Sequence, residues 1–173
     1  VTGKNMDNAR STIYTLNVTD SNPIASPSAN PSSGVSPLTV NFTGSVNGGD
    51  APLTYFWNFT DGGTSSQQNP QYTFNNAGTY NVSFKATDYD NDQSTGYVLV
   101  TVNQPFDFSV SANPSSNSVV QARSVNTTVD VTLVSGTTEN VALSYSGCPT
   151  GATCSFNPSN GNPTYSSTFT VST

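Results

Sequence analysis

The central part of the chain alternates apolar and polar residues in short runs. Leu38, Val40 and Phe42 form the first run, with polar residues between them. Three further runs share this every-second-residue spacing, at 53–59, 80–86 and 98–102. Since successive side chains of a strand point to opposite faces of a sheet, each run predicts a strand with one buried face. No segment keeps a helical period over several turns, so we expect an all-β fold.

Turn-forming sequences separate these runs, and the scheme then repeats. Three segments contain residues that tolerate the left-handed backbone conformations of tight turns: DGG at 61–63, NNAG at 75–78 and DYDND at 88–92. The later apolar runs lie at 106–112, 129–133, 141–145 and 169–171. Only a short polar stretch, Asn103, Gln104 and Pro105, separates the two halves, so we predict two closely coupled β-sandwiches at 23–103 and 104–173.

Two sequence repeats support a tandem array. SANPSS at 28–33 recurs at 111–116, and DNARST at 7–12 resembles DNDQST at 90–95, with the same spacing in both pairs. Tyr14, Leu16 and Val18 then match Val98, Val100 and Val102 after a slip of one residue. Residues 1–22 therefore represent either the closing hairpin of a preceding module or an N-terminal extension, and the sequence favours neither.

Charge and composition exclude several partners. Only 8% of residues are charged, the net charge is −6, and just four residues are Lys or Arg. Nucleic-acid binding needs a basic surface, so no nucleic-acid partner is expected. No run approaches the roughly 20 apolar residues of a membrane span, so we expect no span in this segment.

The two cysteines, Cys148 and Cys154, predict a local disulfide, because Pro149 and Gly151 can turn the backbone between them. A disulfide implies an oxidising compartment. The alternative is a pair of reduced, half-buried thiols. A zinc site is excluded, since about four ligands are needed and the chain has no histidine.

An enzyme is not expected. The absence of histidine removes the Ser/His/Asp and Cys/His arrangements. Glycoside hydrolysis needs two positioned carboxylates, whereas Glu139 is the only glutamate and the aspartates fall mostly at turns. We therefore predict no catalytic residues.

Residues 24–102 resemble a PKD domain, the immunoglobulin-like module named after polycystic kidney disease. The resemblance is carried by SPLTVNFTGS at 36–45, YFWNFTDGG at 55–63, QNPQYTFNNAGTYNVSFKATD at 68–88 and the closing YVLVTV. The family's Trp-Asp-Phe-Gly-Asp-Gly segment stands here as WNFTDG, with Asn58 and Thr60 departing from it. Residues 106–173 look like a second immunoglobulin-like repeat of secreted microbial proteins. The resemblance implies tandem immunoglobulin-like β-sandwiches.

Asp88, Asp90 and Asp92 offer carboxylates at alternate positions of one turn, a hard-oxygen set that suits calcium. The EF-hand pattern fails, because Gln93 stands where its glycine belongs. Calcium is thus a possible cofactor, and a solvated turn is the alternative.

Five Asn-X-Ser/Thr sequons predict glycosylation sites on the outward faces of strands: Asn17, Asn41, Asn58, Asn81 and Asn126. Strand alternation alone would also place polar residues there.

These observations favour a non-catalytic module of an extracellular microbial cell-surface protein, such as a filament, surface-layer or adhesin component. Its expected partners are other copies of itself or neighbouring surface proteins. The alternative is a carbohydrate-binding or spacer region of a secreted hydrolase, for which Phe56 and Tyr89 are exposed aromatic candidates.

Overall fold

The computed structural model describes residues 20–173, and the regular structure of this part is entirely β. The all-β prediction is confirmed. No helix in the described part is long and apolar enough to cross a membrane. Residues 1–19, which include Asn17 and most of the predicted hairpin at 1–22, lie outside the described residues.

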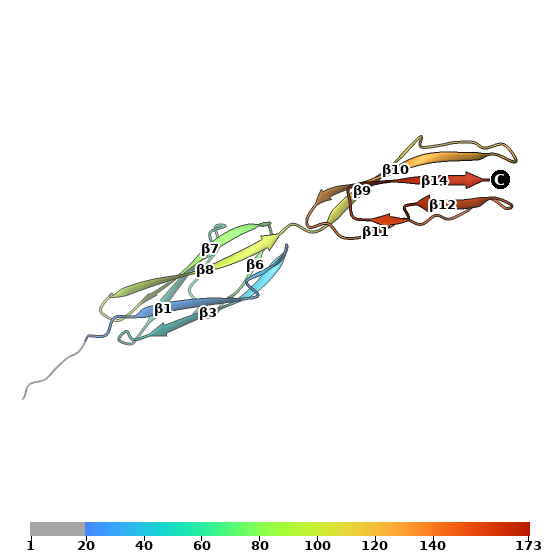
Figure 1. Ribbon diagram of the computed structural model, residues 1–173. Helices are drawn as coiled ribbons and strands as arrows, with labels where there is room; N and C mark the ends of the chain where they lie inside the picture. Colours follow the sequence, from blue (N-terminus) through green and yellow to red (C-terminus); the bar gives the residue numbers. More distant parts are fainter. Residues whose placement is uncertain (1–19) are drawn as a thin grey trace, which may run out of the picture.

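The first sandwich, residues 24–103, contains two sheets that face each other (Figure 1). One sheet has the order β1-β3-β6 and the other the order β2-β8-β7-β4-β5. The eight strands are β1 (Ile24–Asn30), β2 (Ser33–Val35), β3 (Leu38–Asn47), β4 (Thr54–Asn58), β5 (Thr64–Ser65), β6 (Gln71–Phe74), β7 (Gly78–Thr87) and β8 (Gln93–Asn103). All pairs are antiparallel except β2, which runs parallel to β8.

A dense aromatic core fills the first sandwich. Trp57 is fully buried, with its ring centroid 4.5 Å from that of Phe84 and 5.1 Å from that of Phe42. Its indole Nε1 donates a hydrogen bond to the Gln68 carbonyl at 3.2 Å, which satisfies its one polar atom. The predicted inward parity is confirmed for the following core residues: Val40, Phe42, Trp57, Phe59, Val82, Phe84, Val100 and Val102. Phe74 of β6, which lay outside the predicted runs, completes this core.

The second sandwich, residues 107–172, is smaller than the first, and its two sheets differ in size. A four-stranded sheet of order β12-β14-β10-β9 faces a two-stranded sheet, β11-β13. Its strands are β9 (Asp107–Asn113), β10 (Ser124–Ser135), β11 (Val141–Ala142), β12 (Thr153–Asn157), β13 (Asn160–Gly161) and β14 (Tyr165–Ser172). Val131 is fully buried, but its cross-strand neighbour Val110 is 52% exposed. Alternation thus predicted the face of Val110 but not its exposure.

The connector between the sandwiches is bonded to both. The Ser36 N–H donates to the Asn103 carbonyl at 2.9 Å, at the end of β8. The Ser135 hydroxyl donates to the Pro105 carbonyl at 2.8 Å, at the start of the second sandwich. Gly136, at φ +77°, lies so close to the connector that an added Cβ would be 2.4 Å from the Pro105 carbonyl oxygen. The two sandwiches consequently lie end to end, with β8 leading directly into β9 (Figure 1).

Candidate functional site

The turn between β7 and β8 holds the three aspartates that the sequence singled out. The Asp88 N–H donates to the Asp92 carbonyl at 3.1 Å, and the Asp92 N–H donates to Asp88 Oδ1 at 2.8 Å. Asn91 adopts a positive φ of 76° between them, a conformation that asparagine tolerates better than most residues. One carboxylate oxygen from each of Asp88, Asp90 and Asp92 lies within 4.8 Å of the others.

The second oxygen of Asp88 is unusual. Asp88 is only 5% exposed, and its Oδ2 is buried with no hydrogen-bond partner. Interaction with the neighbouring Asp88 carboxyl is the largest cause that raises the pKa of the exposed Asp90 carboxyl. Repulsion from Asp20 and Asp88 raises that pKa further. The turn therefore gathers more negative charge than its own hydrogen bonds balance.

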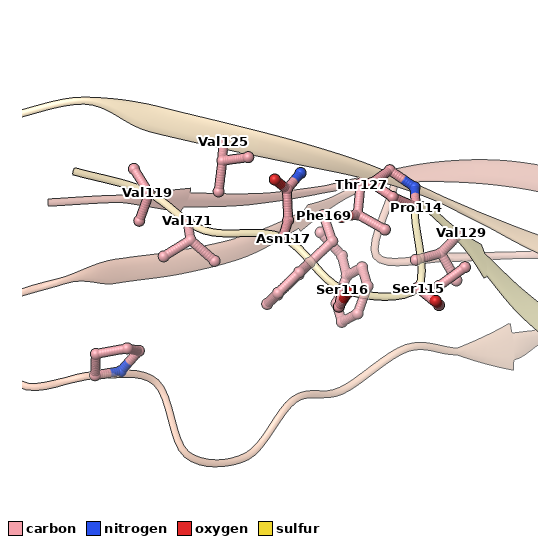
Figure 2. Close-up of a pocket in the computed structure, with 13 residues that line it drawn as sticks. Pro114, Ser115, Ser116, Asn117, Val119, Val125, Thr127, Val129, Phe169 and Val171 are labelled. Atoms are coloured by element: carbon pink, nitrogen blue, oxygen red, sulfur yellow. The ribbon is translucent and has the colours of Figure 1, made fainter.

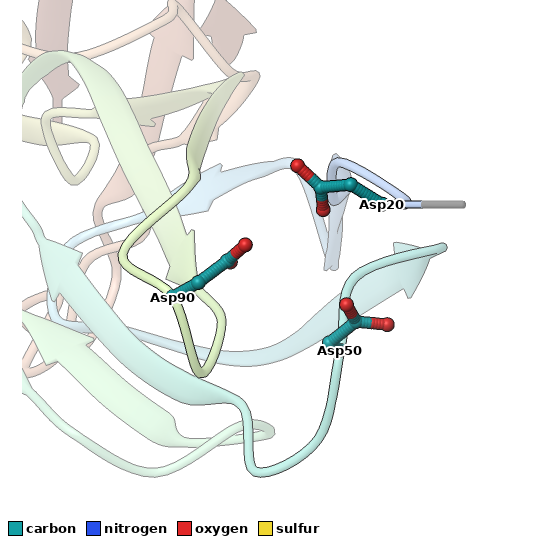
Figure 3. Close-up of side chains that lie close together, drawn as sticks. All are labelled: Asp20, Asp50 and Asp90. Atoms are coloured by element: carbon teal, nitrogen blue, oxygen red, sulfur yellow. The ribbon is translucent and has the colours of Figure 1, made fainter. Parts of the chain in front are cut away.

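Asp20 and Asp50 extend the cluster across the end of the sandwich. A carboxylate oxygen of each lies within 4.8 Å of one from Asp90 (Figure 3). The Tyr89 N–H donates to the Asp50 carbonyl at 3.0 Å, and the Gly49 N–H donates to the Ser21 hydroxyl at 3.2 Å. These bonds tie the three segments together at this end. Sequence reasoning missed Asp20 and Asp50, because no local spacing links them to Asp90.

The five aspartates have the chemistry of a hard-cation site. Calcium takes about six to eight oxygen ligands, which carboxylates, backbone carbonyls and water supply together. Lys85 and Arg123 are the only basic residues among residues 20–173, so protein cations are scarce here. Asp88 Oδ2 is buried without a hydrogen-bond partner, and a bound cation would supply one.

The predicted disulfide is present. Cys148 and Cys154 are joined with an S–S distance of 2.04 Å, and they close the loop that precedes β12. Gly147 and Gly151, at φ +70° and +84°, turn the backbone within and beside this loop. Pro149, within this loop, is one of the residues that line a groove in the second sandwich.

Four of the predicted sequon asparagines are described, and all four are exposed: Asn41, Asn58, Asn81 and Asn126. Asn41 Oδ1 accepts a hydrogen bond from Gln71 Nε2 at 3.0 Å, and Asn58 Oδ1 accepts one from the Thr60 N–H at 2.9 Å. These bonds use the amide oxygen and leave the nitrogen, where a glycan attaches, unengaged by them. Glycosylation at these positions stays a prediction.

Two concave surfaces complete the candidate sites. The first, the inner groove, has a volume of about 390 Å³ and lies on the sheet face of the second sandwich (Figure 2). Its lining is mostly apolar, with Val125, Val129, Phe169 and Val171 on the strands and Val119 on the covering segment. No residue of the lining is titratable, so the groove can bind apolar groups but has no acid or base for catalysis.

The second concave surface is shallower and lies beside β4 and β5. Phe56, Gln67 and Tyr72 are among its lining residues. Phe56 is 45% exposed and Tyr97 63% exposed, and strand pairing puts both on the outer face of the five-stranded sheet. The other aromatic candidate, Tyr89, is 73% exposed in its turn.

Comparisons with known proteins identify relatives of the first sandwich. The family model of the PKD domain matches residues 20–102. The crystal structure of the PKD1 domain of Vibrio anguillarum Epp is 26% identical, covers 50% of this chain and 100% of that one, and has a TM-score of 0.43. The PKD domain of an M14-like peptidase from Thermoplasmatales archaeon SCGC AB-540-F20 is 28% identical, covers 49% and 98%, and has a TM-score of 0.40.

A further solved structure concerns the promiscuous specificity of carbohydrate-binding modules from the β-sandwich superfamily. It is 17% identical, covers 90% of this chain and 93% of that one, and has a TM-score of 0.44. No curated protein matches the chain.

Proposed function

Residues 20–102 of the chain form a PKD domain, a non-catalytic domain type, and on that premise we propose that the chain is a spacer and interaction segment of an extracellular microbial surface protein. The second sandwich continues the array with an immunoglobulin-like module. The chain performs no catalysis itself, and it acts by holding surfaces at a fixed separation and by contacting other proteins.

The observation that carries this proposal is the bonded connector. Hydrogen bonds from Ser36 to Asn103 and from Ser135 to Pro105 attach the short linker to both sandwiches. A linker held in this way transmits orientation from one module to the next, whereas a free tether would not. The Cys148–Cys154 disulfide supports the extracellular setting, because such bonds persist where conditions are oxidising.

Antibody labelling of intact cells of the source organism tests the location. We expect labelling without permeabilisation, and brief protease treatment of intact cells should remove it. Labelling that appears only after permeabilisation would refute the surface assignment.

We also propose that the aspartate cluster binds calcium. The observation that favours it is the buried, unpartnered Asp88 Oδ2, which lies in the turn that also holds Asp90 and Asp92. Asp20 and Asp50 would complete the carboxylate set around Asp90. Calcium there would hold the start of β1 against the two neighbouring loops and so stiffen the entry to the domain. Titration calorimetry of chelator-treated protein tests this proposal, and an absence of binding heat at millimolar calcium would sink it.

A carbohydrate-binding role is the alternative function, favoured by the two exposed aromatic rings on one sheet face. Phe56 and Tyr97 can each offer a ring face to a sugar. Polysaccharide pull-down by the full chain tests it, with Phe56→Ala as the variant that should lose binding. Equal retention of parent and variant would show that Phe56 takes no part.

A further inference from the structure

The outer face of the five-stranded sheet in the first sandwich carries large apolar side chains that water reaches. Strand alternation and pairing direct Phe56 of β4 and both Tyr97 and Leu99 of β8 outward, away from the core. Leu99 is 55% exposed, and Phe56 and Tyr97 are exposed as well. Tyr97 and Leu99 are two residues apart on one strand, so their side chains are neighbours on this face.

Two of the sequon asparagines share this face. Asn81 of β7 lies directly opposite Leu99 in the strand register. Asn58 of β4 lies opposite Ser83 of β7, and Ser83 in turn lies opposite Tyr97. Neighbouring strands are about 4.8 Å apart, so Asn58 and Tyr97 are separated by about 10 Å across the small Ser83 side chain. An asparagine side chain and one linked sugar ring can span that distance.

The other two described sequons have polar surroundings. Asn41 lies opposite Asn30 on one side and Gln71 on the other. Asn126 lies opposite Thr170. The residues two positions before and after each of these asparagines on its strand are serine or threonine. Among residues 20–173, a sequon therefore shares a face with exposed apolar neighbours only on the five-stranded sheet.

We propose that N-linked glycans on Asn58 and Asn81 fold back over this outer face and pack on Tyr97 and Leu99. The C–H groups on one side of a pyranose ring are apolar, and they stack on the face of an aromatic ring. Packing of this kind removes exposed apolar surface of both side chains from water, which is favourable. The sugar hydroxyls on the other side of the ring stay hydrated.

The attachment step uses the asparagine amide and an oligosaccharide from a lipid-linked sugar phosphate donor. Nδ2 bonds to the anomeric carbon of the sugar while the bond from that carbon to the phosphate oxygen breaks. The nitrogen loses one proton, and the lipid phosphate leaves with the bonding electron pair. The hydrogen bond from the Thr60 N–H to Asn58 engages Oδ1 and leaves Nδ2 free of that bond. Such transfer modifies secreted proteins, so the inference rests on the extracellular setting of the proposed function.

The glycans would occupy the surface that the alternative function needs. Phe56 is two residues from Asn58 on the same strand face, and Tyr97 lies in the same row of the sheet as Asn58. Rings that the chain covers with its own sugars cannot stack on an external polysaccharide. The outer face thereby shields the sheet and captures no ligand.

Peptide mass spectrometry of the protein purified from its source organism tests the attachment. We expect a glycan on Asn58 and a glycan on Asn81. An unmodified asparagine at either position would overturn the inference. Cell-surface labelling is independent of this result, so an unglycosylated chain on intact cells would leave the proposed function standing.

A double-mutant cycle in the same organism tests the packing through urea unfolding, followed by Trp57 fluorescence. Tyr97→Ser should lower the folded-to-unfolded ratio about fivefold more in the glycosylated parent than in the variant Asn58→Gln with Asn81→Gln, because only the parent loses a stacked ring. The cycle cancels the effect of changing the asparagines themselves. In the control background Asn41→Gln, on the other sheet, Tyr97→Ser should have the same effect as in the parent. Equal losses in the parent and in the variant without both glycans would overturn the packing.

Nitration by tetranitromethane gives a second measurement that leaves Tyr97 unchanged. Tyr97 should react several-fold more slowly in the glycosylated parent than in the variant Asn58→Gln with Asn81→Gln. Tyr89, which is 73% exposed in the β7–β8 turn, is the control and should react equally in both proteins. Equal rates at Tyr97 would show that the glycans project into solvent, and would overturn the inference.

Discussion

Replacing Asp88 with asparagine should stabilise the first sandwich without calcium and remove most of its response to calcium. Asp88 Oδ1 accepts the Asp92 N–H at 2.8 Å, and an asparagine Oδ1 keeps that bond. The amide nitrogen would take the place of Oδ2, which is buried without a partner, and would offer a donor to Asp90. The substitution thus removes one negative charge and satisfies one buried position.

The size of the effect follows from these contacts. A buried polar atom without a partner costs about 1–3 kcal/mol. Asp90 is exposed to water, so we take the lower end and expect Asp88→Asn to raise the free energy of unfolding by about 1 kcal/mol in chelator. With calcium at about 100 times its Kd, the parent should gain about 2.7 kcal/mol by mass action. The variant, which lacks a charged ligand, should gain less than half of that.

Urea unfolding monitored by tryptophan fluorescence measures both effects. Trp57 is the only tryptophan and is fully buried, so the signal reports on the first sandwich alone. Asp61→Asn is the matched control, because Asp61 Oδ1 accepts bonds from the Gly63 N–H and the Tyr72 hydroxyl away from the cluster. A variant no more stable than the parent in chelator would refute the account of Oδ2. Equal gains from calcium in parent and variant would remove Asp88 from the ligand set.

Three further predictions concern other sites. Thr60 has a φ of +66°, which is an unfavourable conformation for a β-branched residue. Thr60→Gly should therefore stabilise the first sandwich of the unglycosylated protein by about 1 kcal/mol. An unchanged midpoint of urea unfolding would contradict this prediction. Burial and the hydrogen bond to Asp61 raise the pKa of Tyr72 from 10.0 to about 12. The stability that the Tyr72 hydroxyl contributes is complete below pH 10 and is lost as pH rises towards 12. A difference absorbance titration of the parent against Tyr72→Phe should show that this hydroxyl ionises near pH 12. Ionisation near pH 10 would contradict the prediction. Replacing Cys148 and Cys154 with serine should lower the free energy of unfolding of the second sandwich by about 2 kcal/mol, because the loop between them is no longer closed. The unfolding transition reported by Trp57 should not change. If calorimetry shows an unaltered transition for the second sandwich, the disulfide does not stabilise it.

Alternation of apolar and polar residues predicted four strands of the first sandwich and most of its buried residues. It did not identify β1, β2, β5 or β6, so Phe74, which is fully buried on β6, was missed. Val40, Phe42 and Trp57 are buried as expected, because both faces of that core are supplied by nearby, strongly patterned segments. The same reasoning placed Val110 on the inner face of the second sandwich but could not predict its exposure. Exposure depends on which strand lies across a residue, and that is a property of topology.

The aspartate cluster shows a second limit of sequence reasoning. Spacing within one turn identified Asp88, Asp90 and Asp92, since neighbouring turn residues are close in any fold. Asp20 and Asp50 approach Asp90 only because the start of β1, the segment after β3 and the β7–β8 turn meet at one end of the sandwich. The burial of Asp88 likewise follows from that meeting and has no local signature.

The parallel pairing of β2 with β8 determines how the chain would respond to tension. The Thr101 N–H donates to the Ser32 carbonyl at 3.0 Å, and the Ser36 N–H donates to the Asn103 carbonyl at 2.9 Å. A pull between the start of β1 and the end of β8 acts along these strands, so it loads their hydrogen bonds in shear. The bonds must then break together, whereas a pull across the strands would unzip them one at a time. Resistance to pulling is governed by the unfolding rate. The hydrogen bonds of this short parallel pair would therefore limit the rate at which the first sandwich unfolds under tension.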